Sequence, residues 1–279
     1  MDLVGQRRGL NMKTIMGIGA LLLCAGLAVG DIADDFESYG VGSVPGGVWQ
    51  DTINFIDAPT HPASSVSVIQ TADAFGNMTN AVQIVDHIGS SGGMMSRVGA
   101  AAFQRFEIDV RLDQQGNGSS PNWMSAIGFV QDTEQADFNW SPQAFVYTTG
   151  SGRFRLYVQN NDGQGTGFRD WGMGVGQLSL DSWYRVSLEV DTVNGIFDAS
   201  VIDVATGDVL SSTHRTYTGW DAGFGQYDLV SFMDGEYGSN PGTISNISTY
   251  DNANYVPAPG VLGIAALGGM CATRRRRSM

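Results

Sequence analysis

Short runs of alternating apolar and polar residues fill the chain between Asp31 and Tyr255, and they constrain its fold more than any other feature. The clearest two are Trp183–Asp191 and Ile196–Val204. Successive side chains of a strand point to opposite faces, so a period of two predicts a strand with one buried face. Between the two runs lies Asn194-Gly195, whose residues both tolerate positive φ. The pattern therefore predicts a β-hairpin.

Eight further runs show the same alternation and are separated by clusters of Gly, Asn, Asp and Ser. No stretch after Gly30 sustains a helical period. Many short strands without helices predict an all-β fold, a two-sheet antiparallel sandwich or jelly roll, and the length fits one large domain. The eight runs are 66–70, 81–85, 103–112, 124–131, 144–148, 153–159, 229–233 and 244–250.

Five segments of this region carry a resemblance to a known fold family. They are Asp34–Tyr39, Gly46–Trp49, Trp183–Asp191, Phe197–Asp203 and Ile244–Asp251. Together they resemble the concanavalin A-like, or laminin-G-like, jelly roll of many secreted bacterial proteins. The resemblance implies a fold that buries the tryptophans at 49 and 183. It does not assign a function, because this fold hosts lectins, glycan-binding modules, glycosidases and adhesive domains.

Residues 1–30 have the composition of a signal peptide. Arg7, Arg8 and Lys13 form a positive segment, and an apolar stretch follows from Ile15 to Val29. Small residues at 28 and 30 predict cleavage before Asp31. Translation starts at Met1 or Met12 in this interpretation, because both leave a usable export signal.

Residues 256–279 form a second targeting segment with three parts. Pro257-Ala258-Pro259 precedes an apolar run, and four arginines follow, Arg274, Arg275, Arg276 and Arg277. The 14 residues of the run are fewer than the roughly 20 of a stable membrane-spanning helix, although an ordinary C-terminal anchor stays an alternative. Arginines of such segments stay on the cytoplasmic side.

This three-part order resembles the PEP-CTERM sorting signal of bacteria that make exopolysaccharide. The resemblance implies an exosortase-type membrane protease as partner and transient association with the inner membrane. It also implies delivery to the cell surface or the extracellular matrix. Ala258 stands where the family usually has Glu, so removal of the tail and the identity of the enzyme stay open.

The charge of the region from Asp31 to Tyr255 excludes some partners. It holds 27 of the 28 acidic residues of the chain, against eight arginines and no lysine. Such a surface repels nucleic acid and polyanionic glycans, unless a divalent cation bridges the two. Cys24 and Cys271 both lie in the targeting segments, and the three histidines lack zinc-ligand spacing.

A catalytic interpretation rests on Glu107-Ile108-Asp109-Val110-Arg111, which resembles the catalytic strand of laminarinase-type β-glucanases. Glu107 and Asp109 match the nucleophile and its helper, and retaining hydrolysis needs two carboxyl groups about 5 Å apart. Arg111 occupies the place of the general acid/base. The alternative is a half-buried strand whose charged residues face solvent, and this is our expectation.

Carbohydrate binding is the favoured activity. Trp offers a large flat face and a hydrogen-bonding edge to a sugar ring. Four of the six tryptophans lie in or beside polar, Gly-rich segments, although each could instead cap the end of the sandwich. The predicted carbohydrate-binding residues are Trp123, Trp140, Trp171 and Trp220.

Calcium is the predicted cofactor, in a structural role. In related jelly rolls the first and last strands often share such an ion, so the resemblance makes Asp35, Glu37 and Asp251 candidate ligands. Ca²⁺ takes six to eight oxygen ligands. Ordinary solvated acids are the alternative. A second acid-rich segment could hold an ion independently and comprises Asp132, Glu134, Asp137 and Asn139.

Together these features predict an exported surface or matrix protein that acts as a non-catalytic structural or carbohydrate-binding module. Its predicted partners are the exosortase-type protease and a neutral glycan or exopolysaccharide. The alternative function is a degenerate laminarinase-type glycoside hydrolase that uses Glu107 and Asp109.

Overall fold

The computed structural model describes the chain between Ile32 and Pro257, with gaps. These residues form strands and turns, with no helix among them and hence none that could cross a membrane. The described ranges are 32–51, 64–87, 91–98, 101, 103–114, 122–130, 143–148, 154–160, 168–173, 178–191, 193–216, 229–235 and 244–257.

The larger sheet contains eight of the described strands, and every pairing is antiparallel. Seven run in one path, and the eighth, β1, pairs with β15. In spatial order they are β13 (Val209–Thr216), β12 (Ile196–Asp203), β11 (Trp183–Asp191), β6 (Phe103–Gln114), β15 (Ile244–Pro257), β4 (Met78–His87) and β3 (Ser65–Ala72), with β1 (Ile32–Asp34) beside β15.

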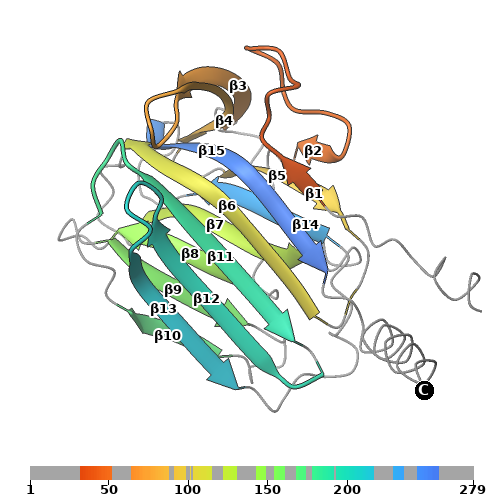
Figure 1. Cartoon of the computed structure of the whole chain (residues 1–279), viewed down its shortest axis with the longest axis vertical. Helices are drawn as coiled ribbons and strands as arrows, with labels where there is room; N and C mark the ends of the chain where they lie inside the picture. Colours follow the sequence, from red (N-terminus) through yellow and green to blue (C-terminus); the bar gives the residue numbers. More distant parts are fainter. Residues whose placement is uncertain are drawn as a thin grey trace, which may run out of the picture.

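The smaller sheet contains seven of the described strands, again all antiparallel. It lies behind β6, β11 and β12 in the view of Figure 1. Its order is β10 (Phe168–Met173), β9 (Phe154–Asn160), β8 (Gln143–Thr148), β7 (Asn122–Val130), β14 (Leu229–Gly235), β5 (Ser91–Arg97) and β2 (Trp49–Asp51). The predicted all-β, two-sheet antiparallel jelly-roll class is therefore confirmed.

The hydrophobic core lies between the sheets. On β6, Phe106 and Ile108 are fully buried and belong to the same core cluster as Phe129 of β7 and Phe232 of β14. Removal of these apolar surfaces from water is the main force that holds the sheets together. The residues that alternate with them on β6 lie on the opposite face, as predicted for this run. Asp109 among them is buried, however, and does not face solvent as expected.

An aromatic cluster at the start of the domain surrounds Asp34. Its carboxylate accepts hydrogen bonds from Trp49 Nε1 (2.8 Å), the Tyr39 hydroxyl (3.0 Å) and the Phe36 backbone N–H (2.8 Å). Phe36 has a positive φ of 58°, which is costly for a bulky residue. Its buried ring, packed on Trp49 and Phe232, stabilises this conformation. Burial and the Asp34 charge raise the pKa of Tyr39 to about 12.

The hairpin predicted at Asn194-Gly195 is present, but its turn differs from the expected one. Asp191 of β11 pairs with Ile196 of β12, so the loop has four residues, 192–195. Positive φ occurs at Gly195 (63°) and not at Asn194. The Asn194 backbone N–H instead donates to the Asp191 carboxylate at 2.9 Å. This side-chain acceptor takes the place of a second left-handed residue.

The two ends of the described chain lie side by side, as expected. Ile32 of β1 pairs with Tyr255 of β15. Strand β15 continues to Pro257, which is paired with Gln104 of β6. The first residue of the proline motif therefore belongs to the sheet, two residues beyond the predicted end of the domain at Tyr255.

Candidate functional site

A cleft of about 340 Å³ opens on the face of the larger sheet that points away from the core. Strands β6, β11 and β15 form its floor, and the β3–β4 and β12–β13 turns form its rim. This volume is at the lower end of the roughly 300–1,000 Å³ typical of ligand pockets.

Asp109 of β6 is held in the floor by three hydrogen bonds. Its side chain is 4% exposed. Arg185 Nε donates to Oδ1 at 2.7 Å, and an Arg185 terminal nitrogen donates to Oδ2 at 2.9 Å. Asn252 Nδ2 also donates to Oδ2, at 3.1 Å. The hydrogen bond to Asp109 raises the pKa of Arg185, so this guanidinium stays charged.

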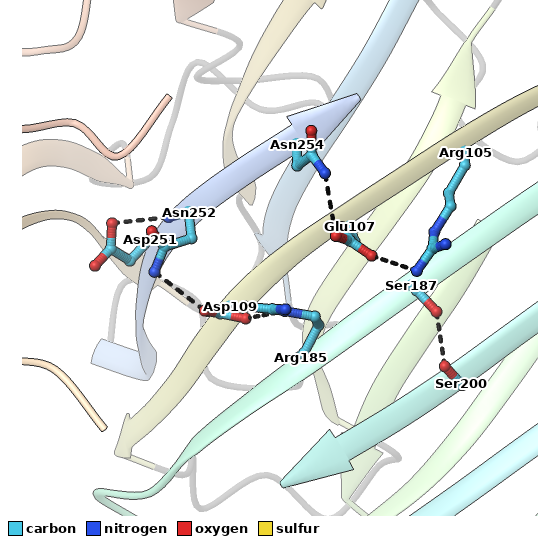
Figure 2. Close-up of polar contacts among 9 residues, drawn as sticks. All are labelled: Arg105, Glu107, Asp109, Arg185, Ser187, Ser200, Asp251, Asn252 and Asn254. Atoms are coloured by element: carbon cyan, nitrogen blue, oxygen red, sulfur yellow. Dashed lines mark hydrogen bonds and ion pairs between the residues drawn. The ribbon is translucent and has the colours of Figure 1, made fainter. Parts of the chain in front are cut away.

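Glu107, two residues earlier on the same face, repeats this arrangement. Arg105 donates to its Oε2 at 2.7 Å, and Asn254 Nδ2 donates to its Oε1 at 3.1 Å. Figure 2 shows Glu107 between Arg105 and Asn254, and Asp109 between Arg185 and Asn252. The floor therefore holds two carboxylates, each with one arginine and one asparagine as donors.

An irregularity in β15 brings the two asparagines opposite these carboxylates. Asp251 pairs with Asp109 and Asn254 with Glu107, so β15 has one residue more than β6 between the two pairs. Asn252 has a φ of 52°, the left-handed conformation that Asn tolerates best after Gly. Such β-bulges redirect side chains and are frequent near functional sites.

Asp251 is the least compensated acid of the cleft. It is buried and accepts from the Asn252 backbone N–H at 2.7 Å and from Thr79 Oγ1 at 3.2 Å. Burial raises its pKa to about 7, and the charges of Asp109 and Asp35 add to the increase. No guanidinium bonds to this carboxylate among the described residues.

The β3–β4 turn presents an aromatic ring at the rim. Phe75 is 71% exposed and lines the cleft. Asp73 fixes the turn, because its carboxylate accepts from the backbone N–H groups of Phe75 and Asn77, both at 2.8 Å. The hydrogen bond from the Asn77 side chain, together with these backbone bonds, lowers the pKa of Asp73. The backbone of the turn that carries the exposed ring is therefore fixed by hydrogen bonds.

Trp183 forms part of the wall. It is 6% exposed, which confirms its predicted burial, and its Nε1 donates to the Ala72 carbonyl at 2.9 Å. The Arg111 guanidinium lies 5.2 Å from the ring centroid. The residue expected to serve the core alone thus also lines the cleft.

The described residues that line this cleft include none of the four tryptophans predicted to bind carbohydrate. Trp123 lies in β7 and Trp171 in β10, on the other sheet, where β8 and β9 separate them. Both were expected in or beside loops, and the structure places them in strands. Trp140 and Trp220 lie outside the described residues.

The three predicted calcium ligands come near one another without forming a metal site. Thr79 Oγ1 lies 2.6 Å from Glu37 Oε1 and 3.2 Å from Asp251 Oδ2. Asp35 instead accepts from the Glu37 backbone N–H at 3.2 Å. Within the described ranges, no group of three or more acidic, His or Cys residues is arranged to hold a metal ion. The predicted ligand set is therefore incomplete as it stands.

The remaining predicted residues lie mostly outside the described part of the chain. These are the signal peptide, the acid-rich segment with Asp132, Glu134, Asp137 and Asn139, and the tail residues Ala258, Pro259, Arg274, Arg275, Arg276 and Arg277. In the laminarinase-like motif, Arg111 occupies the place of the acid and forms an ion pair with Asp113 at 2.5 Å.

Phe75, Arg185, Asn252 and Asn254 line the cleft and were missed by the sequence reasoning. The alternation in β11 is compatible with an outward Arg185, but no local pattern in the sequence links it to Asp109, 76 residues away. The bulge that aligns Asn252 and Asn254 has no turn signal in the sequence. Phe75 could have been found, since it precedes a glycine in a polar Asp-Ala-Phe-Gly-Asn turn.

No protein-family model and no curated protein matches this chain. Among solved structures, the exoplasmic/lumenal domain of VIP36 in its Ca²⁺/Man-bound form aligns with a TM-score of 0.53 and 10% identity, over 82% of this chain and 90% of that one. The metal-free form of the same domain aligns with a TM-score of 0.51 and 11% identity, over 84% of this chain and 93% of that one.

A sialidase aligns with a TM-score of 0.50 and 13% identity, over 83% of this chain. The alignment covers only 19% of the sialidase chain. At these identities the similarities show a shared fold, and this agrees with the two-sheet architecture described above.

Proposed function

We propose that this domain binds a glycan without acidic groups in the cleft over β6, β11 and β15, and that it does not hydrolyse the glycan. The observation that carries this proposal is the pair of carboxylates, Glu107 and Asp109, each held by one arginine and one asparagine.

The arrangement suits sugar hydroxyls, which both donate and accept hydrogen bonds. A carboxylate has about four acceptor positions, and the bonds described above leave part of that capacity on Glu107 and Asp109. The amide oxygens of Asn252 and Asn254 add neutral acceptors. Because the donors already fix these side chains, little conformational entropy is lost when a ligand binds. The exposed ring of Phe75 offers an apolar face for a sugar ring.

The same contacts argue against hydrolysis. Retaining glycosidases need one carboxylate as nucleophile and one protonated carboxylic acid as proton donor. Both oxygens of Glu107 and both oxygens of Asp109 accept hydrogen bonds, with an arginine donor on each side chain. Neither group is placed to donate a proton. Arg111 cannot take this role, because a guanidinium does not give up its proton in proteins.

Export to the cell surface or matrix by an exosortase-type system is part of this proposal. It is supported by the signal-peptide composition of residues 1–30 and by the proline motif, apolar run and arginines at the other end. The fold similarity to VIP36, whose solved forms include a Ca²⁺/Man-bound one, is compatible with glycan binding but concerns that protein.

The experiment is a binding screen of the purified protein against uncharged oligosaccharides, followed by calorimetry with the strongest ligand. Glu107→Gln and Phe75→Ala should each weaken binding about tenfold, since each removes a contact of roughly 1–2 kcal/mol. Val193→Ala is the matched control, because Val193 is 77% exposed on a turn that does not line the cleft. Release of shorter sugars that Glu107→Gln abolishes would establish the hydrolase instead.

Calcium near Asp251 is tested by thermal unfolding with CaCl₂ and with EDTA. A higher melting temperature in calcium that Asp251→Asn abolishes would support the ion as a structural cofactor. Identical melting curves in the two buffers would show that calcium does not stabilise the fold and would contradict the proposed calcium site.

A further inference from the structure

The lining of the cleft carries an excess of negative charge. Among the described residues, four acids line it, Asp73, Glu107, Asp109 and Asp251, against one guanidinium, that of Arg185. That guanidinium is engaged by both oxygens of Asp109. The pKa of Asp251, raised to about 7, leaves that side chain only partly ionised near neutral pH, so the excess comes mainly from the other three acids. A ligand that only exchanges neutral hydrogen bonds would leave this charge uncompensated.

The arginines nearby do not remove the excess. Arg105 bonds to Glu107 from outside the lining, and half of its side chain is exposed to water, which screens its charge. Arg111 is paired with Asp113 and also lies outside the lining. The field inside the cleft therefore favours a cation.

The geometry favours an organic cation over a metal ion. The carboxylates of Glu107 and Asp109 are bonded to separate donors, and no three acids of the described residues are grouped as a metal ion needs. An ammonium group brings three donors and no acceptor, so it can bond to acceptors that do not converge on one point. An aromatic ring at the rim, Phe75, adds an apolar face for the sugar ring that carries the ammonium.

We propose that the cleft selects glycans that carry free amino groups, such as hexosamine units without their acetyl groups, over N-acetylated or acidic glycans. This inference rests on the proposed function and names the chemistry of its ligand. The ammonium lies against Glu107 and Asp109, and the sugar ring lies toward Phe75.

The test compares glucosamine oligomers with N-acetylglucosamine oligomers of the same length by calorimetry. The buffer is at about pH 6, below the ~7.7–8.0 pKa of an ordinary α-amino group, with about 0.15 M salt to screen distant charges. The amine-bearing oligomer should bind at least about tenfold more tightly. Glu107→Gln should remove this preference, and Arg105→Gln should increase it, since the variants change the charge of the site in opposite directions.

Two controls separate the cleft from the acidic surface as a whole. Asp208→Asn removes an exposed acid outside the cleft and should leave the preference unchanged. An oligolysine of equal charge should bind no better to the unmodified protein than to Glu107→Gln. A preference that survives Glu107→Gln, or that oligolysine reproduces, would overturn the proposal.

The outcomes also distinguish this inference from the proposed function. Equal or tighter binding of the N-acetylated oligomer would overturn the amine preference and leave glycan binding standing. Binding of neither oligomer, nor of any uncharged oligosaccharide, would overturn both.

Discussion

At the residue scale, the site depends on buried charge that is compensated locally. Asp109 is almost completely buried, and burial of an ionised carboxylate is costly unless a cation and hydrogen bonds compensate it. Arg185 supplies two hydrogen bonds and the charge, and Asn252 supplies a third bond. Glu107 and Arg105 form a second carboxylate–guanidinium pair, which lies nearer the solvent. The two pairs therefore offer a direct comparison of the same contact at different depths.

Replacement of Arg185 by Met should destabilise the fold by about 2 kcal/mol. This is below the ~3–5 kcal/mol found when fully buried pairs are broken, because 38% of the Arg185 side chain is exposed. Arg105→Met is the control and should cost under about 1 kcal/mol, since half of the Arg105 side chain is exposed to water. Urea-induced unfolding measures both values. Equal losses of unfolding free energy in the two variants would contradict the claim that the more deeply buried pair contributes more.

Asp251 predicts a specific pH dependence. Its folded pKa of about 7 lies above the ordinary value of 3.8, so the protonated side chain stabilises the fold relative to the ionised one. This stabilisation is fully present below pH 3.8 and is lost as the pH rises through about 7. The free energy of unfolding of Asp251→Asn should therefore rise, relative to that of the unmodified protein, by about 1–2 kcal/mol as the pH increases from roughly 5 to 8. Thr79 can donate to Glu37 and accept from the new amide.

Urea unfolding of both proteins across this range, with EDTA present, measures the gain. The difference between the two proteins isolates the group, because other titrating residues are common to both. A difference that stays constant with pH would contradict the assignment.

At the element scale, close approach of strands in the two sheets depends on glycine at one position of β5. A Cβ on Gly92 would lie 2.9 Å from Ser64 Cβ and 3.0 Å from Ile84 Cγ2. Gly92→Ala should cost about 1–3 kcal/mol, as overpacking of a core does. Gly46→Ala, which meets nothing within 4 Å, should change stability by under about 0.5 kcal/mol. The urea midpoints of the two variants would decide this.

The elements also show what the sequence could and could not predict. Strands with a clear alternation, such as β6 and β11, were predicted with nearly their observed bounds. Five strands escaped prediction for reasons that lie in their composition or length. Strand β5 reads Ser-Gly-Gly-Met-Met-Ser-Arg, β13 is mostly polar, β10 reads Phe-Arg-Asp-Trp-Gly-Met without a clear alternation, and β1 and β2 have three residues each.

The site was harder to predict than the fold, because it depends on pairing between distant strands. Glu107 and Asp109 were identified from one strand, but their interpretation changes with Asn254 and Arg185, which come from β15 and β11. The bulge at Asn252 shifts the register by one residue, and nothing local in the sequence marks it. Chemistry that arises from register is invisible until strand order is known.

At the scale of the whole molecule, the two sheets have different roles in this account. The cleft lies on the larger sheet, whereas the two predicted tryptophans that the structure describes, Trp123 and Trp171, lie on the smaller one. Ile32 and Tyr255 pair at neighbouring positions, so both ends of the domain emerge from the larger sheet. A sorting tail after Pro257 would then be attached directly to the sheet that carries the cleft.

The most direct test of the central claim is a crystal structure of the protein with a bound glucosamine or N-acetylglucosamine oligomer. We expect density for a sugar in the cleft, within hydrogen-bonding distance of Glu107 or Asp109 and next to Phe75. Sugar density on the smaller sheet at Trp123 or Trp171, with an empty cleft, would contradict it.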